Sequence, residues 1–180
     1  MSFTDEELVR RFQAGDPAAF EGVVVRWNPL VLELAYRMTG DLEEARDIRQ
    51  LALLKTHNAL ERFGGRSRLS TWIYRVVLNL CRDRHRKSRR HDDAVLGSAP
   101  AAEAFEGSAA ASNEARETAE RVADAVRSLP DLEREVVVLR HYHDLSFGEI
   151  AEIQDAPVTT VQSRMARGLV ALRAQLSDLS

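Results

Sequence analysis

The chain has 180 residues, of which 44% are hydrophobic and 29% are charged. This length fits one medium or two small domains, and the composition excludes both a large multidomain enzyme and a wholly disordered chain. The single cysteine, Cys81, cannot form an internal disulfide or a cysteine-based metal cage, so disulfide scaffolds and zinc fingers are excluded. Because the sequence has no signal-peptide pattern and no long uncharged apolar stretch, we expect a cytoplasmic protein without membrane insertion.

The net charge of −3 conceals one basic segment. Residues 62–90 contain 10 Lys and Arg but 1 Asp, whereas residues 1–61, 91–130 and 131–180 each carry more acidic than basic side chains. Clustered arginines on one element are typical of a contact with the phosphate backbone of nucleic acid. A solvated basic helix end would show the same cluster, so charge alone leaves both interpretations open.

Apolar spacing predicts three helices in the first part of the chain. Apolar residues recur at intervals of three and four over residues 17–38, which indicates one buried face of a helix. Asp41 is positioned to cap a second helix that runs to about Leu60, and a third begins near Ser70 and leads into the basic run RDRHRKSRR. We expect these three helices to pack as one bundle.

Residues 91–113 are acidic, rich in Ala, Ser and Gly, and without periodicity, which predicts a flexible linker. Beyond the linker, one helix is predicted to end before Pro130 and another to cover residues 132–142. The expected fold is therefore all-α, with two small helical domains, residues 1–90 and 114–180, joined by the flexible linker.

The last part of the chain has the pattern of a helix-turn-helix. Ser146 opens a short helix with a capping box, and a break at Gln154-Asp155 separates it from a final helix with a polar outer face. In this motif the second helix enters the major groove of DNA, although a plain helical hairpin with a polar face would show the same pattern. The residues expected to be buried are Val161, Met165, Leu169 and Leu172, and those expected to point outward are Thr159, Thr160, Gln162, Ser163, Arg164, Ala166 and Arg167.

No pattern of residues predicts catalysis. The chain has no HExxH pattern, Gly-rich phosphate loop or nucleophile elbow, and His141 and His143 would point to different sides of a helix. We therefore expect no enzymatic activity, no cofactor and no metal site, and we interpret Cys81 as a small core residue.

The segment 63–75 mixes aromatic side chains, small polar groups and arginines beside the basic helix. Aromatic rings with neighbouring arginines suit unpaired bases, which need a flat stacking surface and charge opposite the phosphates. The competing interpretation is that Phe63 and Trp72 belong to the core.

The two halves of the chain together resemble one family. The matching stretches in the first half are LVRRFQAGDPAAFEGVVVRW, LAYRMTGDLEEARDI and ALERFGGRSRLSTWIYRVVLNLCRD. In the second half they are LPDLEREVVVLRHYHDLSFGEIAEI and PVTTVQSRMARGLVALR. Their order resembles the extracytoplasmic-function (ECF) sigma factors, small bacterial initiation factors with regions two and four. The resemblance implies an alternative sigma factor that directs RNA polymerase to promoters in a stress or envelope response.

The resemblance also implies which residues bind each partner. Region two, residues 1–90, would bind the clamp helices of core RNA polymerase and capture a flipped base of the minus-ten promoter element. Region four, residues 114–180, would read the minus-thirty-five element of promoter DNA, and its helix 132–142 would pack on the polymerase flap. The implied polymerase-binding residues are Asp47, Gln50 and Leu51, and the implied minus-thirty-five residues are Thr160, Gln162, Ser163, Arg164 and Arg167. The implied minus-ten residues are Phe63, Arg66, Ser67 and Ser70, with Tyr74, Asn79 and Asp83 along one face of the next helix.

The chain departs from the family pattern at several positions. Leu51 stands where Glu is usual and His57 where aromatic residues are usual, which predicts an altered clamp contact. Gln154-Asp155 replaces the usual Leu-Gly of the turn, which predicts local strain because Asp adopts the left-handed conformation less readily than Gly. Gln162 stands where a basic residue is common, so promoter preference does not carry over from the family.

Members of the family are usually held inactive by an anti-sigma factor, and a broad apolar stripe at Leu51, Leu53 and Leu54 would suit such a partner. The alternative from another class of protein is a stand-alone helix-turn-helix repressor with a helical dimerisation or sensing domain. A repressor should bind its operator alone as a dimer, whereas a sigma factor should act as a monomer with core polymerase.

Overall fold

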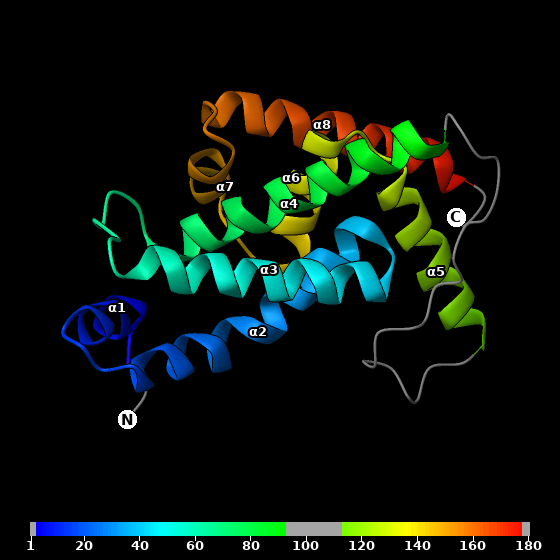
Figure 1. The fold of residues 1–180 in the computed structure, drawn as a ribbon. Helices are drawn as coiled ribbons and strands as arrows, with labels where there is room; N and C mark the ends of the chain where they lie inside the picture. The colour runs from blue at the N-terminus through cyan, green and yellow to red at the C-terminus, as the bar shows by residue number, and fades with distance from the viewer. Residues whose placement is uncertain (1–2, 93–112, 178–180) are drawn as a thin grey trace.

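The computed structural model describes residues 3–92 and 113–177, and these residues form eight helices and no strand (Figure 1). The all-α prediction is therefore confirmed. From the N-terminus the helices are α1 (Asp5–Gln13), α2 (Ala18–Thr39), α3 (Leu42–Leu60), α4 (Leu69–Asp92), α5 (Asn113–Arg127), α6 (Asp131–Tyr142), α7 (Phe147–Gln154) and α8 (Val158–Gln175). Residues 93–112, which make up most of the predicted linker, lie outside the described residues.

Nothing in the apolar spacing predicts the short helix α1. A capping box closes its N-terminus: the Glu7 N–H donates to the Thr4 hydroxyl at 3.2 Å, and the Thr4 N–H donates to the Glu7 carboxylate at 2.7 Å. Leu8 and Val9 are buried where α1 packs on α2. The Thr-x-x-Glu spacing at residues 4–7 is a sequence signal that would have located this helix.

Helices α2, α3 and α4 form the predicted bundle. Helix α2 ends at Gly40, whose φ of 75° is left-handed. Asp41 then caps α3 by accepting the Glu44 N–H at 2.8 Å. The residues of α3 that are buried in the bundle are Ala45, Ile48, Ala52, Thr56 and Leu60. His57 lies beside them, with its ring against Phe12 of α1 and Phe20 of α2 at centroid distances of 5.4 and 4.8 Å.

Helices α7 and α8 form the predicted helix-turn-helix. The Glu149 N–H donates to the Ser146 hydroxyl at 3.2 Å and the Ser146 N–H donates to the Glu149 carboxylate at 2.8 Å, which completes the expected capping box. The turn passes through Asp155 at φ 48° and ψ 52°, the left-handed conformation in which strain is expected for a residue other than glycine.

The prediction that Leu169 is buried in α8 is wrong. Leu169 is 50% exposed, whereas Val161 and Gly168 are buried. A Cβ atom at position 168 would lie 3.1 Å from a methyl group of Val137, so α8 approaches α6 closely at this glycine. Close approach at Gly168 turns the neighbouring Leu169 toward solvent, which apolar spacing cannot predict.

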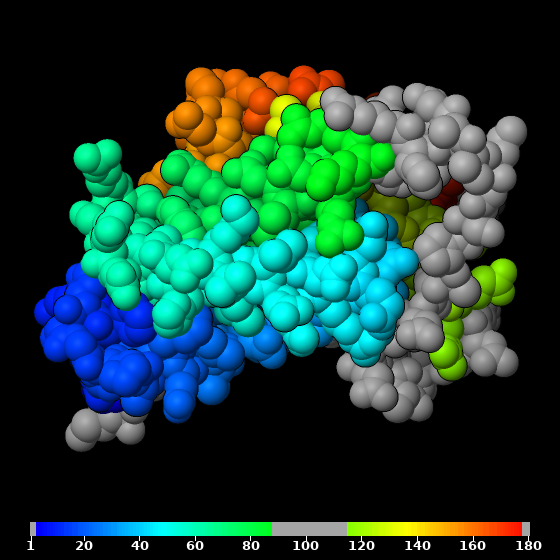
Figure 2. Space-filling model, in the orientation of Figure 1, coloured from blue at the N-terminus to red at the C-terminus, as the bar shows by residue number. Residues whose placement is uncertain are grey.

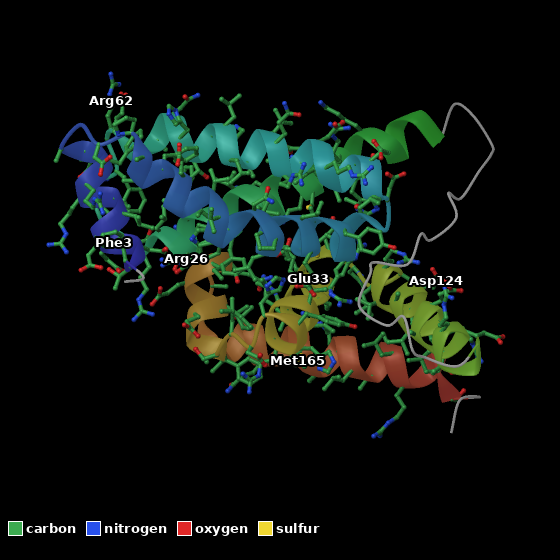
Figure 3. The ribbon with its side chains drawn as sticks, turned by 90° about the horizontal axis from the view of Figure 1, so that it is seen from below. Phe3, Arg26, Glu33, Arg62, Asp124 and Met165 are labelled. Carbon is green, nitrogen blue, oxygen red and sulfur yellow. The ribbon has the colours of Figure 1, made fainter. Side chains whose placement is uncertain are left out.

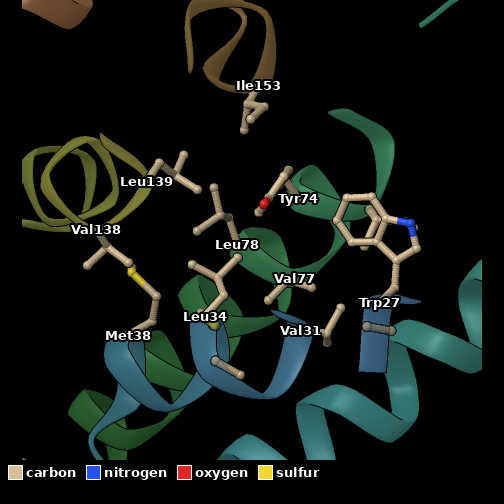
Figure 4. Close-up of a cluster of buried hydrophobic side chains, with 14 of the residues drawn as sticks. Trp27, Val31, Leu34, Met38, Tyr74, Val77, Leu78, Val138, Leu139 and Ile153 are labelled. Atoms are coloured by element: carbon tan, nitrogen blue, oxygen red, sulfur yellow. The ribbon is translucent and has the colours of Figure 1, made fainter. Parts of the chain in front are cut away.

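The two halves of the chain pack against each other around a common core. Val138 and Leu139 of α6 and Ile153 of α7 are buried together with Leu34 of α2 and Leu78 of α4 (Figure 4). Seen from below, α2, α3 and α4 lie on one side and α6, α7 and α8 on the other (Figure 3). The sequence predicted two linked domains but not this contact between them.

Within the described residues, no helix is long and apolar enough to span a membrane.

Candidate promoter and polymerase interfaces

The outer face of α3 carries the implied polymerase-binding residues. Asp47, Gln50 and Leu51 are all exposed, and Leu54 one turn further is 56% exposed. Helix α3 lies across the front of the molecule with this face open to solvent (Figure 2). The Asp47 carboxylate pairs with Arg84 of α4 at 3.2 Å, an exposed contact that a partner can displace at small cost. Two acceptors and two leucines therefore share one accessible strip.

The loop between α3 and α4 carries the first implied minus-ten residues. Arg66 is exposed and Phe63 and Ser67 are half-buried in this loop, whereas Ser70 is half-buried in the first turn of α4. The Phe63 ring stands edge-on to Trp72 with the ring centroids 6.4 Å apart, so both interpretations of the aromatics hold in part. Phe63 therefore packs against the core but remains partly accessible.

Gln13 of α1 anchors this loop, and sequence reasoning missed it. Its side-chain amide donates to the carbonyl oxygens of Leu60 at 3.0 Å and of Phe63 at 2.9 Å. The first of these oxygens belongs to the last turn of α3, where helical carbonyls lack partners within the helix. One amide group therefore ties the end of α3 to the start of the loop. The contact spans about fifty residues, so no local pattern indicates it.

The prediction that Tyr74, Asn79 and Asp83 share one face of α4 is wrong. Asn79 and Asp83 are exposed, but Tyr74 is 6% exposed. Five residues separate positions 74 and 79, which is about 140° around a helix that turns 100° per residue. The Tyr74 ring instead packs edge-on against Trp27 and His143, each with a centroid distance of 5.5 Å. Burial raises the pKa of the Tyr74 hydroxyl to about 12.

The polar face of α8 is accessible. Gln162, Ser163 and Arg167 are exposed, and Thr160 and Arg164 are partly exposed. The Arg167 guanidinium pairs with Glu133 of α6 at 2.9 Å while its side chain remains 60% exposed. All five implied minus-thirty-five residues therefore lie on one accessible helix.

A chain of hydrogen bonds runs from α4 through α6 and α7 to α8. Arg82 of α4 donates to both carboxylate oxygens of Glu135, at 2.5 and 2.7 Å, and Glu135 is fully buried. The Gln154 amide donates to the same carboxylate at 2.8 Å, and its oxygen accepts from Arg164 at 2.8 Å. Since these four residues are far apart in sequence, sequence reasoning could not assemble them.

Other contacts between the two halves use arginines and main-chain carbonyls. Arg75 of α4 donates to the carbonyls of Glu152 and Ile153, at 3.2 and 3.3 Å, and Arg134 of α6 donates to the Met38 carbonyl at 2.8 Å. Burial lowers the pKa of Arg134 from its ordinary value. These bonds satisfy carbonyls near the ends of α7 and α2.

The single cysteine lies in the core of the molecule. Cys81 is buried, as predicted, and burial raises the pKa of its thiol to about 12, so it remains protonated. No group of three or more His, Cys, Asp or Glu side chains in the described part of the chain could hold a metal ion.

Comparison with known proteins matches both halves. The family Sigma-70 region 2 matches residues 23–91, and the family Sigma-70, region 4 matches residues 119–172. The ECF RNA polymerase sigma factor SigW of Bacillus subtilis (strain 168) is 34% identical, and the match covers 99% of this chain and 100% of that protein. The ECF RNA polymerase sigma-E factor of Escherichia coli (strain K12) is 35% identical, with 98% and 96% covered.

Two solved structures have a similar fold. CnrH in complex with the cytosolic domain of CnrY has a TM-score of 0.74 at 24% identity, and the match covers 98% of this chain and 99% of that one. The sigma factor RpoE from Bartonella quintana, in complex with the anti-sigma factor NepR, has a TM-score of 0.72 at 20% identity, with 88% and 96% covered.

Proposed function

Since the chain belongs to the extracytoplasmic-function RNA polymerase sigma factors, we propose that three accessible surfaces bind the polymerase, the minus-ten element and the minus-thirty-five element. The protein is an alternative sigma factor that directs RNA polymerase to promoters for transcription initiation, and it is not an enzyme. Family membership decides against the stand-alone repressor. The observation that carries the proposal is that α3, the loop with α4, and α8 each keep a polar face accessible although the two halves are packed together.

The outer face of α3 binds the clamp helices of the polymerase. Asp47 and Gln50 supply hydrogen-bond acceptors, and Leu51 and Leu54 supply apolar area that the molecule itself leaves exposed. Leu51 replaces the usual acidic residue, so this contact relies more on apolar burial than in other family members. We assign residues 1–90 to region two and residues 114–180 to region four, on either side of the 91–113 linker.

The loop with Phe63 and the exposed side of α4 capture the minus-ten element in its single-stranded form. Phe63 supplies the stacking surface, Arg66 and Ser67 lie in the same loop, and Ser70 follows in the first turn of α4. Asn79 and Asp83 continue this surface along α4. Tyr74 cannot contact the single-stranded DNA while the halves are packed together, because its ring is covered by His143.

The polar face of α8 reads the minus-thirty-five element in the major groove. Gln162 is exposed in the N-terminal half of α8, where side chains of a recognition helix contact base edges, and Arg167 is exposed at the middle of the helix. Ser163 donates to the Thr159 carbonyl at 2.9 Å, so its hydroxyl oxygen remains free to accept.

An anti-sigma factor is the proposed regulatory partner. The similar structures include the sigma factor RpoE in complex with the anti-sigma factor NepR. The exposed leucines Leu51 and Leu54 are apolar area that such a partner can cover. Because the protein acts with RNA polymerase, we place it in the cytoplasm. Because it belongs to the extracytoplasmic-function family, we expect it to serve a stress or envelope response.

Permanganate footprinting of open complexes tests the minus-ten surface. Phe63→Ala should leave polymerase binding intact but reduce promoter opening, because stacking of one unpaired base contributes about 1–3 kcal/mol. Asn79→Ala should reduce promoter opening too, because it removes an exposed amide that can hydrogen-bond to the DNA. Run-off transcription with core polymerase provides the parallel measurement of activity. Unchanged reactivity of the unpaired thymines in both variants would remove the assigned role.

A further inference from the structure

The turn of the helix-turn-helix contains a side chain whose polar groups are all engaged. Gln154 is the last residue of α7, and its amide donates to Glu135 at 2.8 Å and to the Leu132 carbonyl at 3.1 Å. Its oxygen accepts a hydrogen bond from the Arg164 guanidinium at 2.8 Å. An amide has two N–H donors and one carbonyl oxygen, and all of these groups have partners here. Gln154 is therefore held in one orientation by α6 and in turn holds a side chain of α8.

The residue it holds, Arg164, is one of the accessible residues on the proposed reading face of α8. An arginine has a long flexible side chain with five N–H donors in a rigid fork. One of these donors is bound to Gln154, and the others have no hydrogen-bond partner among the described residues. Fixing one prong of the fork removes rotamer freedom before DNA binds and leaves the other donors for the DNA.

The contact belongs entirely to region four. Glu135, Gln154 and Arg164 lie on α6, α7 and α8, so the arrangement does not require region two to remain packed against them. Arg82 of α4 adds two hydrogen bonds to Glu135 in the packed form, but Glu135 also binds Gln154 directly. The positioning of Arg164 can therefore persist when the two halves separate on the polymerase.

We propose that Gln154 is a positioning residue that orients Arg164 for recognition of the upstream promoter element. The proposal rests on the proposed role of α8. It also explains what the glutamine at position 154 contributes in place of the usual leucine, since an apolar leucine would leave Arg164 without this acceptor. An arginine held in advance discriminates between promoters better than a mobile one, because less freedom is lost on binding.

The test is a double-mutant cycle in reconstituted holoenzyme. Gln154→Met, Arg164→Ala and the double variant are assayed by transcription from promoters that differ only in the upstream element. Gln154→Met should lower the preference for the best element about 3- to 10-fold, the range expected for one lost hydrogen bond. In the Arg164→Ala background the same change should have no further effect, because Gln154 acts through Arg164.

Gln175→Met is the matched control, because this exposed glutamine at the end of α8 contacts Ser128 and is remote from the turn. Gln154→Leu serves as a second variant if the methionine variant does not fold, which thermal unfolding reveals. An equal loss of preference in both backgrounds, or no loss in either, would overturn the proposal. If Arg164→Ala itself changes no promoter preference, the positioning proposal fails, whereas the role of α8 is tested separately by Arg167→Ala on the same promoters.

Discussion

Arg167 has one partner in this structure and another in the proposed complex. Its guanidinium pairs with Glu133 at 2.9 Å, but the side chain is 60% exposed, and exposed ion pairs contribute about 0–1 kcal/mol to stability. Arg167→Ala should therefore lower the free energy of unfolding by less than about 1 kcal/mol while weakening upstream-element binding by about 1–3 kcal/mol if it reads a base. Thermal unfolding and a promoter-variant panel measure the two effects.

The panel also separates two kinds of contact. A base contact by Arg167 relaxes preference at one position, whereas a phosphate contact weakens binding to all promoters equally. Undiminished binding to every promoter in the panel would mean that α8 docks differently from a recognition helix.

Gln13 makes a further prediction, because two hydrogen bonds from one amide hold the loop that carries Phe63. Gln13→Ala should cost about 1–3 kcal/mol of stability, at about 0.5–1.5 kcal/mol for each bond, and should reduce promoter opening. Urea unfolding and permanganate footprinting measure these effects. Arg10→Ala is the control, since the Arg10 side chain bonds within α1 to the Glu6 carbonyl. Equal promoter opening in the two variants would contradict an anchoring role.

Single positions differ in how far the sequence could predict them. The exposure of Asn79 and Gln162 follows from helical spacing. The same spacing places Tyr74 on a different face of α4 from Asn79, so the burial of Tyr74 was also predictable. The contacts of Gln13 and Gln154 could not be predicted, because their partners lie on other helices. The spacing of apolar residues within one helix indicates which side faces the core, whereas a hydrogen bond between helices depends on how the helices pack.

The start of α7 contributes stability that depends on pH. Hydrogen bonds from the Ser146 side chain and backbone hold the pKa of Glu149 below its ordinary value of 4.5. A lowered pKa in the folded state stabilises the protein above the ordinary value, and this contribution is lost as pH falls through the lowered pKa. Glu149→Gln should therefore be less stable than the wild type near neutral pH, and the difference should shrink in acid.

Urea unfolding over a pH series measures this difference. Ser146→Ala should cost about 0.5–2 kcal/mol near neutral pH, as loss of an N-cap usually does. Glu152→Gln is the matched control, because Glu152 is exposed on the same helix. A constant difference between Glu149→Gln and the wild type across the whole series would contradict the ionised capping box.

Helices with strong local signals were predictable. Asp41, Ser146 and Pro157 each stand at a helix start that the sequence indicates, and the polar face of α8 is visible in its spacing. Helix α1 has nine residues and too few apolar positions to establish a period, so only its cap marks it. The packing of α6 and α7 on α2 and α4 was not predictable. The apolar faces of these helices can be explained by packing within each half, so the sequence gives no sign of a contact between the halves.

With its two halves packed together, the protein is too small to span the distance between the two promoter elements. A compact chain of 180 residues has a radius of gyration of about 16 Å. Two promoter elements about two helical turns apart lie roughly 70 Å from each other. The two proposed promoter-binding surfaces therefore cannot both bind their elements until the halves separate. Region four is also acidic overall, which weakens its attraction for DNA phosphates.

We therefore expect the free protein to bind promoter duplex weakly and without selectivity, and to bind selectively once core polymerase is added. Fluorescence anisotropy with labelled duplex at about physiological salt measures both states. Tight selective binding by the free protein would contradict this prediction.

His143 makes the contact between the halves sensitive to pH. Burial lowers its pKa below the ordinary value of 6.5, and its Nε2 atom has no hydrogen-bond partner among the described residues. Tyr74 of α4 lies against the ring, Glu33 and Arg37 of α2 act on its charge, and Asp144 follows it. The unfolded chain takes up the proton first, so stability should fall as pH drops below about 6.5 and level off below the lowered pKa.

His143→Phe keeps an aromatic ring and should remove this pH dependence, which thermal unfolding between about pH 5 and 8 measures. His141→Phe changes an exposed histidine two residues away and should leave the dependence intact. The same slope in both variants would place the sensitivity elsewhere.

Some arginines join the two halves by binding main-chain oxygens. These contacts do not restrict which residue occupies the partner position. Arg75 binds the carbonyls of Glu152 and Ile153, and these carbonyls are present whatever residue occupies either position. The pair Arg82 and Glu135 requires both side chains. Coupled variation among relatives should therefore concentrate on positions 82 and 135. A region four exchanged from a relative could dock on this region two if it kept the carboxylate at position 135, which makes the halves interchangeable parts.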